Sequence, residues 1–393
     1  MSASLDRLVR EQKLIVCVGP GGVGKTTVSA AVGLAGARAG RKTVVLTIDP
    51  ARRLADALGL PGLDDEIRAV PVETLPARED GSPTAPLHAA MVDTAASYAS
   101  LIRRIAPDEA THRRILDNRV FQAVSKSLAR SHAYVAMERL YDAMQNHDYD
   151  LVVLDTPPAR NALDILDAPM SLANFLDSRF VEWFLPGEGP RGIRDRIIAS
   201  GGAVAKRMLG LITGKKLLDE IVSFLEAFAT LREGFAARAT TVDASLREPG
   251  TSFVLVSSAN PASADDAAWL RHDLQRRKVP VSGVIYNQSF VSLDPAAPMQ
   301  CVTTLRDDDL DARVAQLEPH LQSLDDPRAL LRDVRAMRAE AAAENARFTG
   351  IVDGLAAELE PGCAQIRAPR FQEEIRDLPG LLRLVDVLTG VAR

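Results

Sequence analysis

Short apolar runs alternate along the chain with longer stretches of helical periodicity. The runs that predict β-strands are residues 13–18, 43–48, 151–155, 252–257, 281–287 and 365–368. Runs that are apolar throughout are typical of strands buried on both faces, as in a parallel sheet covered by helices. The Pro- and Gly-rich residues 71–86 predict a loop. The pattern therefore predicts an α/β fold whose central sheet is mostly parallel and flanked by helices.

Two further segments predict helices outside this alternation. Between residues 169 and 249 apolar side chains recur every three or four positions, which predicts a helical subdomain inserted into the α/β core. Residues 305–360 are charged, alanine-rich and amphipathic, which predicts a long surface helix or a helical hairpin. We expect a core from 1–168, 250–304 and 361–393, with helical segments at 169–249 and 305–360.

A glycine-rich loop follows the first predicted strand. Residues 19–27 read Gly-Pro-Gly-Gly-Val-Gly-Lys-Thr-Thr, and this pattern between a strand and a helix is typical of a phosphate-binding loop. Backbone N–H groups of such a loop surround a polyphosphate, and the helix directs its positive end at the same charge. We expect Lys25 on the β- and γ-phosphates of a nucleoside triphosphate and the Thr26 hydroxyl on Mg²⁺. The predicted nucleotide contacts are Gly19, Gly21, Gly22, Val23, Gly24, Lys25, Thr26 and Thr27.

Three polar residues stand at the ends of other predicted strands. Asp155 is a candidate for the carboxylate that holds Mg²⁺, and its alternative role is that of a strand-end or helix-capping residue. Asp49 is a candidate to orient the water that attacks the γ-phosphate, and it also suits a helix N-terminus; both roles can hold at once. Asn287 is placed to bind a base edge, although a turn asparagine would look the same. Because no N-K-x-D guanine motif is present, ATP is favoured over GTP.

The composition narrows the functional classes. Among 393 residues the net charge is −5, which argues against a general nucleic-acid-binding surface. Cys17, Cys301 and Cys363 are too few and too far apart for a disulfide framework or a C-x-x-C zinc pair. Cys17 lies inside the first predicted strand, where a buried apolar role is expected. No leader peptide or transmembrane run is recognisable, so a cytoplasmic protein is expected.

Taken in order along the chain, four motifs resemble the ArsA family of P-loop ATPases. They are the loop at 19–27, IDPARRLADALG at 48–59, LDTPPARNALDILDAP at 154–169 and IYNQ at 285–288, with a weaker echo at 368–376. The family includes the arsenite-pump ATPase and the eukaryotic ATPase that delivers tail-anchored membrane proteins, and MinD and ParA are looser relatives. The resemblance implies an ATP-driven dimer whose helical subdomains move as two switch segments respond to the γ-phosphate.

The resemblance also implies roles for single residues. By position, Asp49 resembles the water-activating aspartate of the first switch, and Asp155 resembles the Mg²⁺-linked aspartate of the second. Asn287 resembles the adenine contact, and Pro369 resembles a residue of the loop beside the adenine.

The chain departs from the family at Pro20. Family members usually carry there a second lysine that reaches the partner's phosphates across a dimer, and proline has neither the charge nor an N–H. Slow intrinsic hydrolysis, a substitute cation such as Arg52 or Arg53, or a heterodimer with a paralogous ATPase subunit that donates the lysine would each explain the change. We favour the heterodimer, with a homodimer as the alternative. The family's pump cysteines and interfacial C-x-x-C pair also lack counterparts, so arsenite transport is not expected.

Within the predicted insertion, residues 191–216 carry a local net charge of +6 among interleaved apolar residues. Such a stretch can bind an anionic membrane surface or a partner helix, and the alternative is a solvated face over the subdomain's own core. The leading hypothesis is an ATPase that couples Mg-ATP turnover to rearrangement of a helical subdomain, which binds an apolar helical client or a partner. The alternatives are a nucleotide-binding regulatory subunit with low intrinsic activity and a ParA- or MinD-like positioning ATPase on DNA or membrane.

Overall fold

The structure is a computed structural model, and it describes most of the chain between residues 5 and 390. The described residues are 5–48, 53–64, 66–78, 80–92, 102–103, 106, 108–118, 132–146, 148–158, 163, 166–167, 232–279, 281–290, 327–371 and 373–390. The strands are β1 Leu14–Val18, β2 Thr43–Thr47, β3 Arg68–Ala69, β4 Leu87–Met91, β5 Leu151–Asp155, β6 Thr251–Ser258, β7 Val281–Asn287 and β8 Ala364–Arg367. The helices are α1 Leu5–Glu11, α2 Lys25–Arg38, α3 Arg53–Ala57, the 3-10 helix η1 Val72–Thr74, α5 Glu109–Leu116, α7 His132–Asn146, α13 Arg232–Arg247, α14 Pro261–Arg276, α16 Pro327–Ala356 and α17 Leu378–Thr389.

In the described part of the chain, eight strands form one sheet in the order β3-β4-β2-β5-β1-β6-β7-β8. All neighbouring strands pair in parallel except β3 and β4, which are antiparallel. Strands β1, β2 and β5 are buried along their whole length, as expected of apolar strands covered on both faces. The predicted mostly parallel sheet with flanking helices is therefore confirmed.

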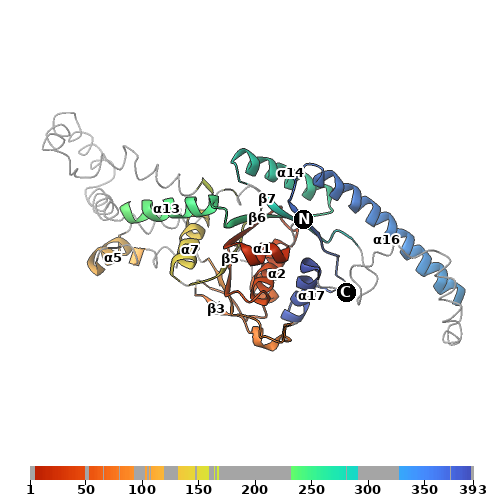
Figure 1. Ribbon diagram of the computed structural model, residues 1–393, viewed down its shortest axis with the longest axis horizontal. Helices are drawn as coiled ribbons and strands as arrows, with labels where there is room; N and C mark the ends of the chain where they lie inside the picture. Colours follow the sequence, from red (N-terminus) through yellow and green to blue (C-terminus); the bar gives the residue numbers. More distant parts are fainter. Residues whose placement is uncertain are drawn as a thin grey trace.

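Helices cover both faces of the sheet (Figure 1). One core cluster joins α1, α2, α3 and α17 to one face, and a second joins α7, α13, α14 and α16 to the other. In the parallel part of the sheet the carboxyl ends of the strands meet at one edge, which is where open α/β sheets bind ligands. The loops after β1, β5, β6 and β7 therefore open onto a common region.

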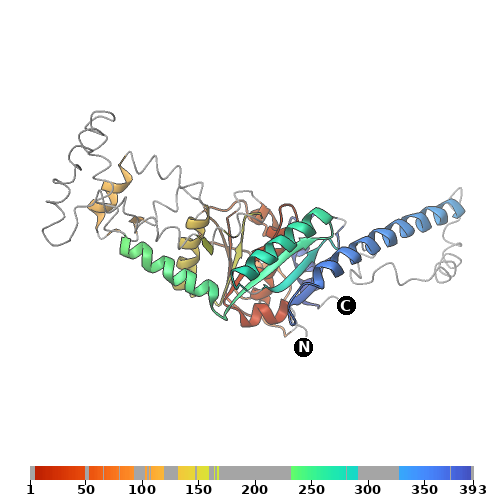
Figure 2. The ribbon, with the colours of Figure 1, turned by 90° about the horizontal axis from the view of Figure 1, so that it is seen from above.

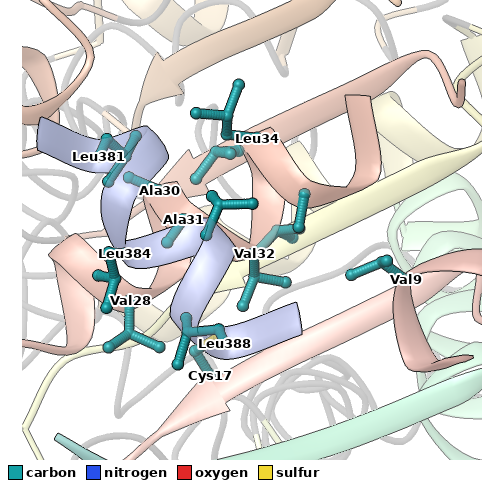
Figure 3. Packing of buried hydrophobic residues seen from close by; sticks show 14 of the residues in the cluster. Val9, Cys17, Val28, Ala30, Ala31, Val32, Leu34, Leu381, Leu384 and Leu388 are labelled. Carbon is teal, nitrogen blue, oxygen red and sulfur yellow. The ribbon is translucent and has the colours of Figure 1, made fainter. Parts of the chain in front are cut away.

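Helix α2 is buried almost all round because it lies between the sheet and α17. Leu381, Leu384 and Leu388 of α17 pack over the small side chains of α2 (Figure 3). The Asp377 carboxylate caps the start of α17 by accepting a 2.7 Å hydrogen bond from the Gly380 N–H. On its sheet side α2 carries Gly33, where a Cβ would lie 2.2 Å from Val45 Cγ2. The glycine thus sets how closely the helix that follows the phosphate-binding loop approaches β2.

Helices α13 and α16 extend beyond the sheet in opposite directions (Figures 1 and 2). Helix α13 packs against α7 and reaches β6 directly, whereas α16 packs against α14. No helix among the described residues is both long enough and apolar enough to span a bilayer.

The strand prediction holds at every predicted position, with ends that differ by no more than one residue. The structure adds β3 and β4, which the sequence pattern did not predict; β4 begins directly after the predicted loop 71–86 and η1 lies inside that loop. Within the predicted helical segment 305–360, α16 occupies Pro327–Ala356, and 305–326 lie outside the described residues. Within 169–249, α13 is described and 169–231 are not. The division into domains stays a prediction.

Two glycine substitutions test the packing of α2. Gly33→Ala should lower the free energy of unfolding by about 1–3 kcal/mol, because the new methyl group overlaps the stiff Val45 side chain. Gly350→Ala, in the open middle of α16 with nothing within 4 Å, should raise the free energy of unfolding by about 0.5–1 kcal/mol through helix propensity. Urea unfolding measures both, and shifts of the same sign would contradict the packing argument.

Candidate functional site

The phosphate-binding loop, residues 19–24, is pressed between β6 and Asn287. A Cβ on Gly19 would lie 2.1 Å from the Val256 carbonyl oxygen. Gly24 has φ +82°, and a Cβ there would lie 2.4 Å from Asn287 Nδ2. A side chain is therefore excluded by space at Gly19 and by both space and backbone conformation at Gly24. A Cβ on Gly22, in contrast, would meet no atom within 4 Å, so the loop is open on that side.

Lys25, the first residue of α2, lies back over the loop that precedes it. Its side chain is buried, with 8% exposure, and Nζ donates a hydrogen bond of 2.8 Å to the Pro20 carbonyl oxygen. A buried ammonium group requires acceptors, and a backbone carbonyl of the loop provides one. The cation is thus held inside the loop, at the place where the sequence predicts a polyphosphate.

Asp155, the last residue of β5, is fully buried. Its carboxylate accepts hydrogen bonds from Thr47 Oγ1 at 2.8 Å and Ser29 Oγ at 3.2 Å. Burial raises the pKa of this carboxyl group, against the opposing effects of the Thr47 and Thr26 hydroxyls and the Lys25 charge. Asp155 therefore lies among hydroxyl groups and close to one cation, in a site that disfavours its negative charge.

The sheet register brings these groups together. Asp155 lies opposite Cys17 of β1 and opposite Thr47 of β2. Beyond the strands, the Ile48 N–H donates to the Asp155 carbonyl at 3.2 Å, and Thr156 Oγ1 donates to the Cys17 carbonyl at 2.8 Å. The chain that leads into residue 49 is thus anchored on the end of β5. Asp49 itself, with Arg52, lies outside the described residues.

Asn287 ends β7 and contacts the loop directly. Its side chain is buried, and Nδ2 donates a hydrogen bond of 2.9 Å to the Val23 carbonyl oxygen. Pro369 is buried just beyond β8, where the preceding Ala368 N–H donates to the Tyr286 carbonyl at 2.9 Å. The structure therefore brings both predicted base contacts to the edge where the loop lies. Thr27 is half-buried on α2. The roles of all these residues stay predictions.

The cysteines follow the expected pattern where they are described. Cys17 is fully buried in β1, and burial raises its pKa to about 12. Cys363 is half-buried, and burial raises its pKa to about 11. A thiol with so high a pKa contains little thiolate at neutral pH, and the thiolate is the metal-binding form. Cys301 lies outside the described residues.

Sequence reasoning missed the two hydroxyl groups that hold Asp155. Ser29 follows Lys25 by four residues, so the helical period places both on one face of α2. Thr47 precedes Asp49 by two residues at the end of β2. Helix spacing could have indicated Ser29, whereas Thr47 becomes visible only when the register between β2 and β5 is known.

The donor set suits a hard divalent cation. Asp155 offers carboxylate oxygens, and Thr26 adds a buried hydroxyl close enough to oppose the rise in the pKa of Asp155. Mg²⁺ prefers oxygen ligands and is usually bound by one or two protein groups together with water and substrate phosphates. Among the described residues no group of three or more His, Cys, Asp or Glu side chains could hold a metal ion. The site therefore fits a cation that arrives with a phosphate ligand.

Comparisons with known proteins agree with this geometry. The family model described as anion-transporting ATPase matches residues 12–315. An uncharacterized protein of Streptomyces coelicolor is 28% identical over 288 residues, which cover 68% of this chain and 67% of that protein. The ATPase get3 of Schizosaccharomyces japonicus is 22% identical over 77% of this chain and 82% of its own. The ATPase ASNA1 homolog 1 of Paramecium tetraurelia is 29% identical over 40% of this chain, and the match spans 44% of that protein.

The buried carboxylate makes stability depend on pH. Because the folded-state pKa of Asp155 is raised above 3.8, its favourable contribution is present at low pH and is lost as pH rises through the folded-state value. In nucleotide-free protein, Asp155→Asn should therefore gain stability relative to wild type as the pH rises from about 4, near the unfolded-state pKa, to about 8. Urea unfolding at both values measures the change.

The exposed Asp266→Asn on α14 is the matched control and should leave the pH dependence unchanged. An Asp155→Asn variant whose stability relative to wild type is the same at both pH values would contradict the assignment.

Proposed function

The chain belongs to the anion-transporting ATPase family and is an ATP-hydrolysing P-loop enzyme, and from that premise we propose that it couples Mg-ATP turnover to rearrangement of a helical subdomain. The observation that carries the proposal is the convergence of Lys25 and Asp155 at the phosphate-binding loop. The buried Lys25 ammonium already occupies the loop, and it lies close enough to the buried Asp155 carboxylate to oppose the rise in that group's pKa.

In this proposal the loop residues bind the triphosphate through backbone N–H groups. Lys25 exchanges the Pro20 carbonyl for phosphate oxygens, a stronger charge-assisted contact. Asn287 and Pro369 hold the adenine at the ends of β7 and β8. Asn287 is suited to this role because it is already fixed against the loop through Val23.

Thr26 and Asp155 would hold Mg²⁺. When bound, the ion neutralises charge on the phosphate oxygens. Asp49 orients the attacking water in this proposal, and Ile48, the residue before it, is hydrogen-bonded to the end of β5. Thr47 and Ser29 are positioning residues, since they contact Asp155 rather than the predicted ligand.

The coupling to a helical subdomain rests on two connections. Helix α7 leads into β5, which ends at Asp155, and α13 leads from the predicted insertion 169–249 into β6, which borders the loop. Helices α7 and α13 are joined by a largely buried ion pair, Arg238 to Glu138 at 3.2 Å. In this proposal, a displacement of Asp155 is transmitted to the insertion through two packed helices, α7 and α13. An apolar helical client, or an anionic membrane surface at the basic residues 191–216, would be bound there, in the cytoplasm.

A dimer is part of the proposal, and Pro20 favours a specific form of it. Pro20 contributes only its carbonyl group to the intramolecular contact with Lys25 and supplies no cation to a partner. A heterodimer with a paralogous subunit that donates the lysine is therefore favoured over a homodimer. The second candidate function, a regulatory subunit with low intrinsic activity, rests on the same residue.

Substitutions can test whether Lys25 binds the nucleotide and whether Asp49 orients the attacking water. Lys25→Ala should abolish nucleotide binding or turnover, since the phosphate charge loses its partner. Asp49→Asn should retain binding of a slowly hydrolysed ATP analogue and lose turnover by about 10²-fold or more, in line with removal of a group that positions the nucleophile. Calorimetry measures binding, and phosphate release measures turnover.

Asp266→Asn, at an exposed aspartate of α14 outside the four motifs, is the matched control and should hydrolyse ATP at the wild-type rate. Normal turnover by Asp49→Asn would remove that residue from the mechanism, and normal binding and turnover by Lys25→Ala would overturn the whole proposal.

The missing trans lysine predicts a gain of function. Pro20→Lys retains the carbonyl that Lys25 contacts and should raise the concentration-dependent ATPase rate of the isolated chain at least tenfold, because a comparable arginine finger contributes about 10³ to 10⁵ in rate. Pro20→Ala separates this effect from mere loss of the proline ring. Equal rates for Pro20→Lys and Pro20→Ala would show that the isolated chain does not lack this cation.

A further inference from the structure

The predicted insertion 169–249 is joined to the α/β core at two places, and an arginine ion pair lies at each. Just before the chain enters the insertion, Asp167 pairs with Arg277 at the end of α14. Where the chain returns to the core, Arg238 of α13 pairs with Glu138 of α7. We call the first pair the exposed joint and the second pair the buried joint, because the two differ in their access to water.

The buried joint fixes α13 on α7. The two helices pack side by side (Figure 1), and Arg238 Nη1 lies 3.2 Å from Glu138 Oε2. The exposed fractions of these two side chains are 16% and 6%. The Arg238 guanidinium also lies 4.5 Å from the centre of the Tyr141 ring. Separating the members of a buried pair leaves charges without compensation, which is strongly unfavourable. The buried joint is therefore expected to stay closed when the insertion rearranges.

The exposed joint costs less to open. Arg277 Nη1 lies 2.5 Å from Asp167 Oδ1, and the exposed fractions of these side chains are 29% and 56%. Exposed ion pairs contribute little to stability and are screened by salt. Arg277 also binds Asp273 through Nε at 2.8 Å, and Asp273 has a second pair with Arg276 at 3.0 Å. The largely buried Asp273 carboxylate therefore stays paired even when Arg277 is replaced.

Arg277 is presented to Asp167 from a fixed helix end. Helix α14 ends in a Schellman motif, in which Lys278 adopts the left-handed conformation with φ +58°. The two hydrogen bonds of the motif run from the Lys278 N–H to the Gln275 carbonyl at 2.9 Å and from the Val279 N–H to the Leu274 carbonyl at 3.0 Å. On the other side of the joint, Leu166 is buried with 3% exposure. Arg277 thus holds Asp167 at the point where the chain leaves the buried Leu166.

We propose that the insertion turns about the buried joint and that the exposed joint opens when Mg-ATP binds. This inference rests on the proposed function, because it assumes that the nucleotide rearranges the insertion. The motif at 154–169 contains both Asp155, beside the phosphate-binding loop, and Asp167, at the exposed joint. A change in charge at the loop therefore acts on the segment that the exposed joint holds. Of the two joints, this one has the smaller cost of opening.

Calorimetry on the full chain with Mg²⁺ and a slowly hydrolysed ATP analogue tests the proposal. Asp167→Asn and Arg277→Gln should each bind the analogue about two- to fivefold more tightly than wild type, the range expected from loss of an exposed ion pair. The reason is that the pair stabilises only the arrangement that the analogue disfavours. The double variant should bind no more tightly than either single variant, because both changes break the same contact.

Salt separates an electrostatic joint from a merely structural role. The difference between each variant and wild type should be present at about 0.05 M salt. It should vanish at about 1 M salt, where the Debye length is about 3 Å. Asp167→Glu keeps the charge and should bind the analogue as wild type does.

Arg276→Gln is the matched control, because the Arg276 guanidinium pairs with Asp273 rather than with Asp167, and it should bind the analogue as wild type does. Arg238→Met breaks the buried joint and should lower the free energy of unfolding without tightening the binding of the analogue. Circular dichroism verifies that each variant folds, and Arg238→Lys takes the place of Arg238→Met if the latter does not fold.

Three results would overturn the proposal. They are wild-type or weaker affinity in both Asp167→Asn and Arg277→Gln, equal tightening by the Arg238 variant, and tightening that persists at high salt. Failure of the analogue to bind wild type would instead count against the proposed ATPase mechanism.

Discussion

The arrangement of the site depends on one buried carboxylate. Asp155 is held by the hydroxyl groups of Thr47 and Ser29, which come from β2 and α2, while Lys25 supplies the nearby positive charge. Because the interior disfavours an isolated charge, these partners stabilise the ionised form against the effect of burial. The interaction therefore joins the ends of β2 and β5 to α2, the helix that follows the phosphate-binding loop. It fixes how these groups lie relative to the place where a triphosphate would bind.

The coupling that we propose between the site and distant helices rests on the same constraint. A carboxylate that is costly to bury without a cation has two electrostatically different states, one with and one without a bound phosphate and metal. Helix α7 leads into the strand that ends at Asp155, and it is tied to α13 by the Arg238–Glu138 pair, with the Arg238 guanidinium 4.5 Å above the Tyr141 ring. Breaking such a buried pair is strongly unfavourable, so α7 and α13 are expected to move together.

Much of the fold followed from local patterns in the sequence, and what was missed depends on contacts between distant residues. The strands rich in Val, Ile and Leu were predicted within one residue of their ends, and the glycine spacing predicted the loop. Strand β4 was missed because Leu87–Met91 contains histidine and alanine in place of β-branched residues, so its pairing with β2 and β3 defines it. Thr47 lies 108 residues from Asp155, so their contact leaves no local signal in the sequence.

Pro20 stands where the family pattern has a second lysine, and the effect of this change depends on the contacts that residue 20 makes. The contact between Lys25 and residue 20 uses a backbone carbonyl, which every amino acid supplies. The position of Lys25 in the phosphate-binding loop therefore does not depend on the side chain at residue 20. Only a contact to another molecule would use a lysine side chain there. Family members with two lysines combine an intramolecular contact to the residue at the position of Lys25 with a trans contact. The proline retains the intramolecular contact with Lys25 and would remove the trans contact. In the heterodimer that we propose, the partner's own loop would supply the cation.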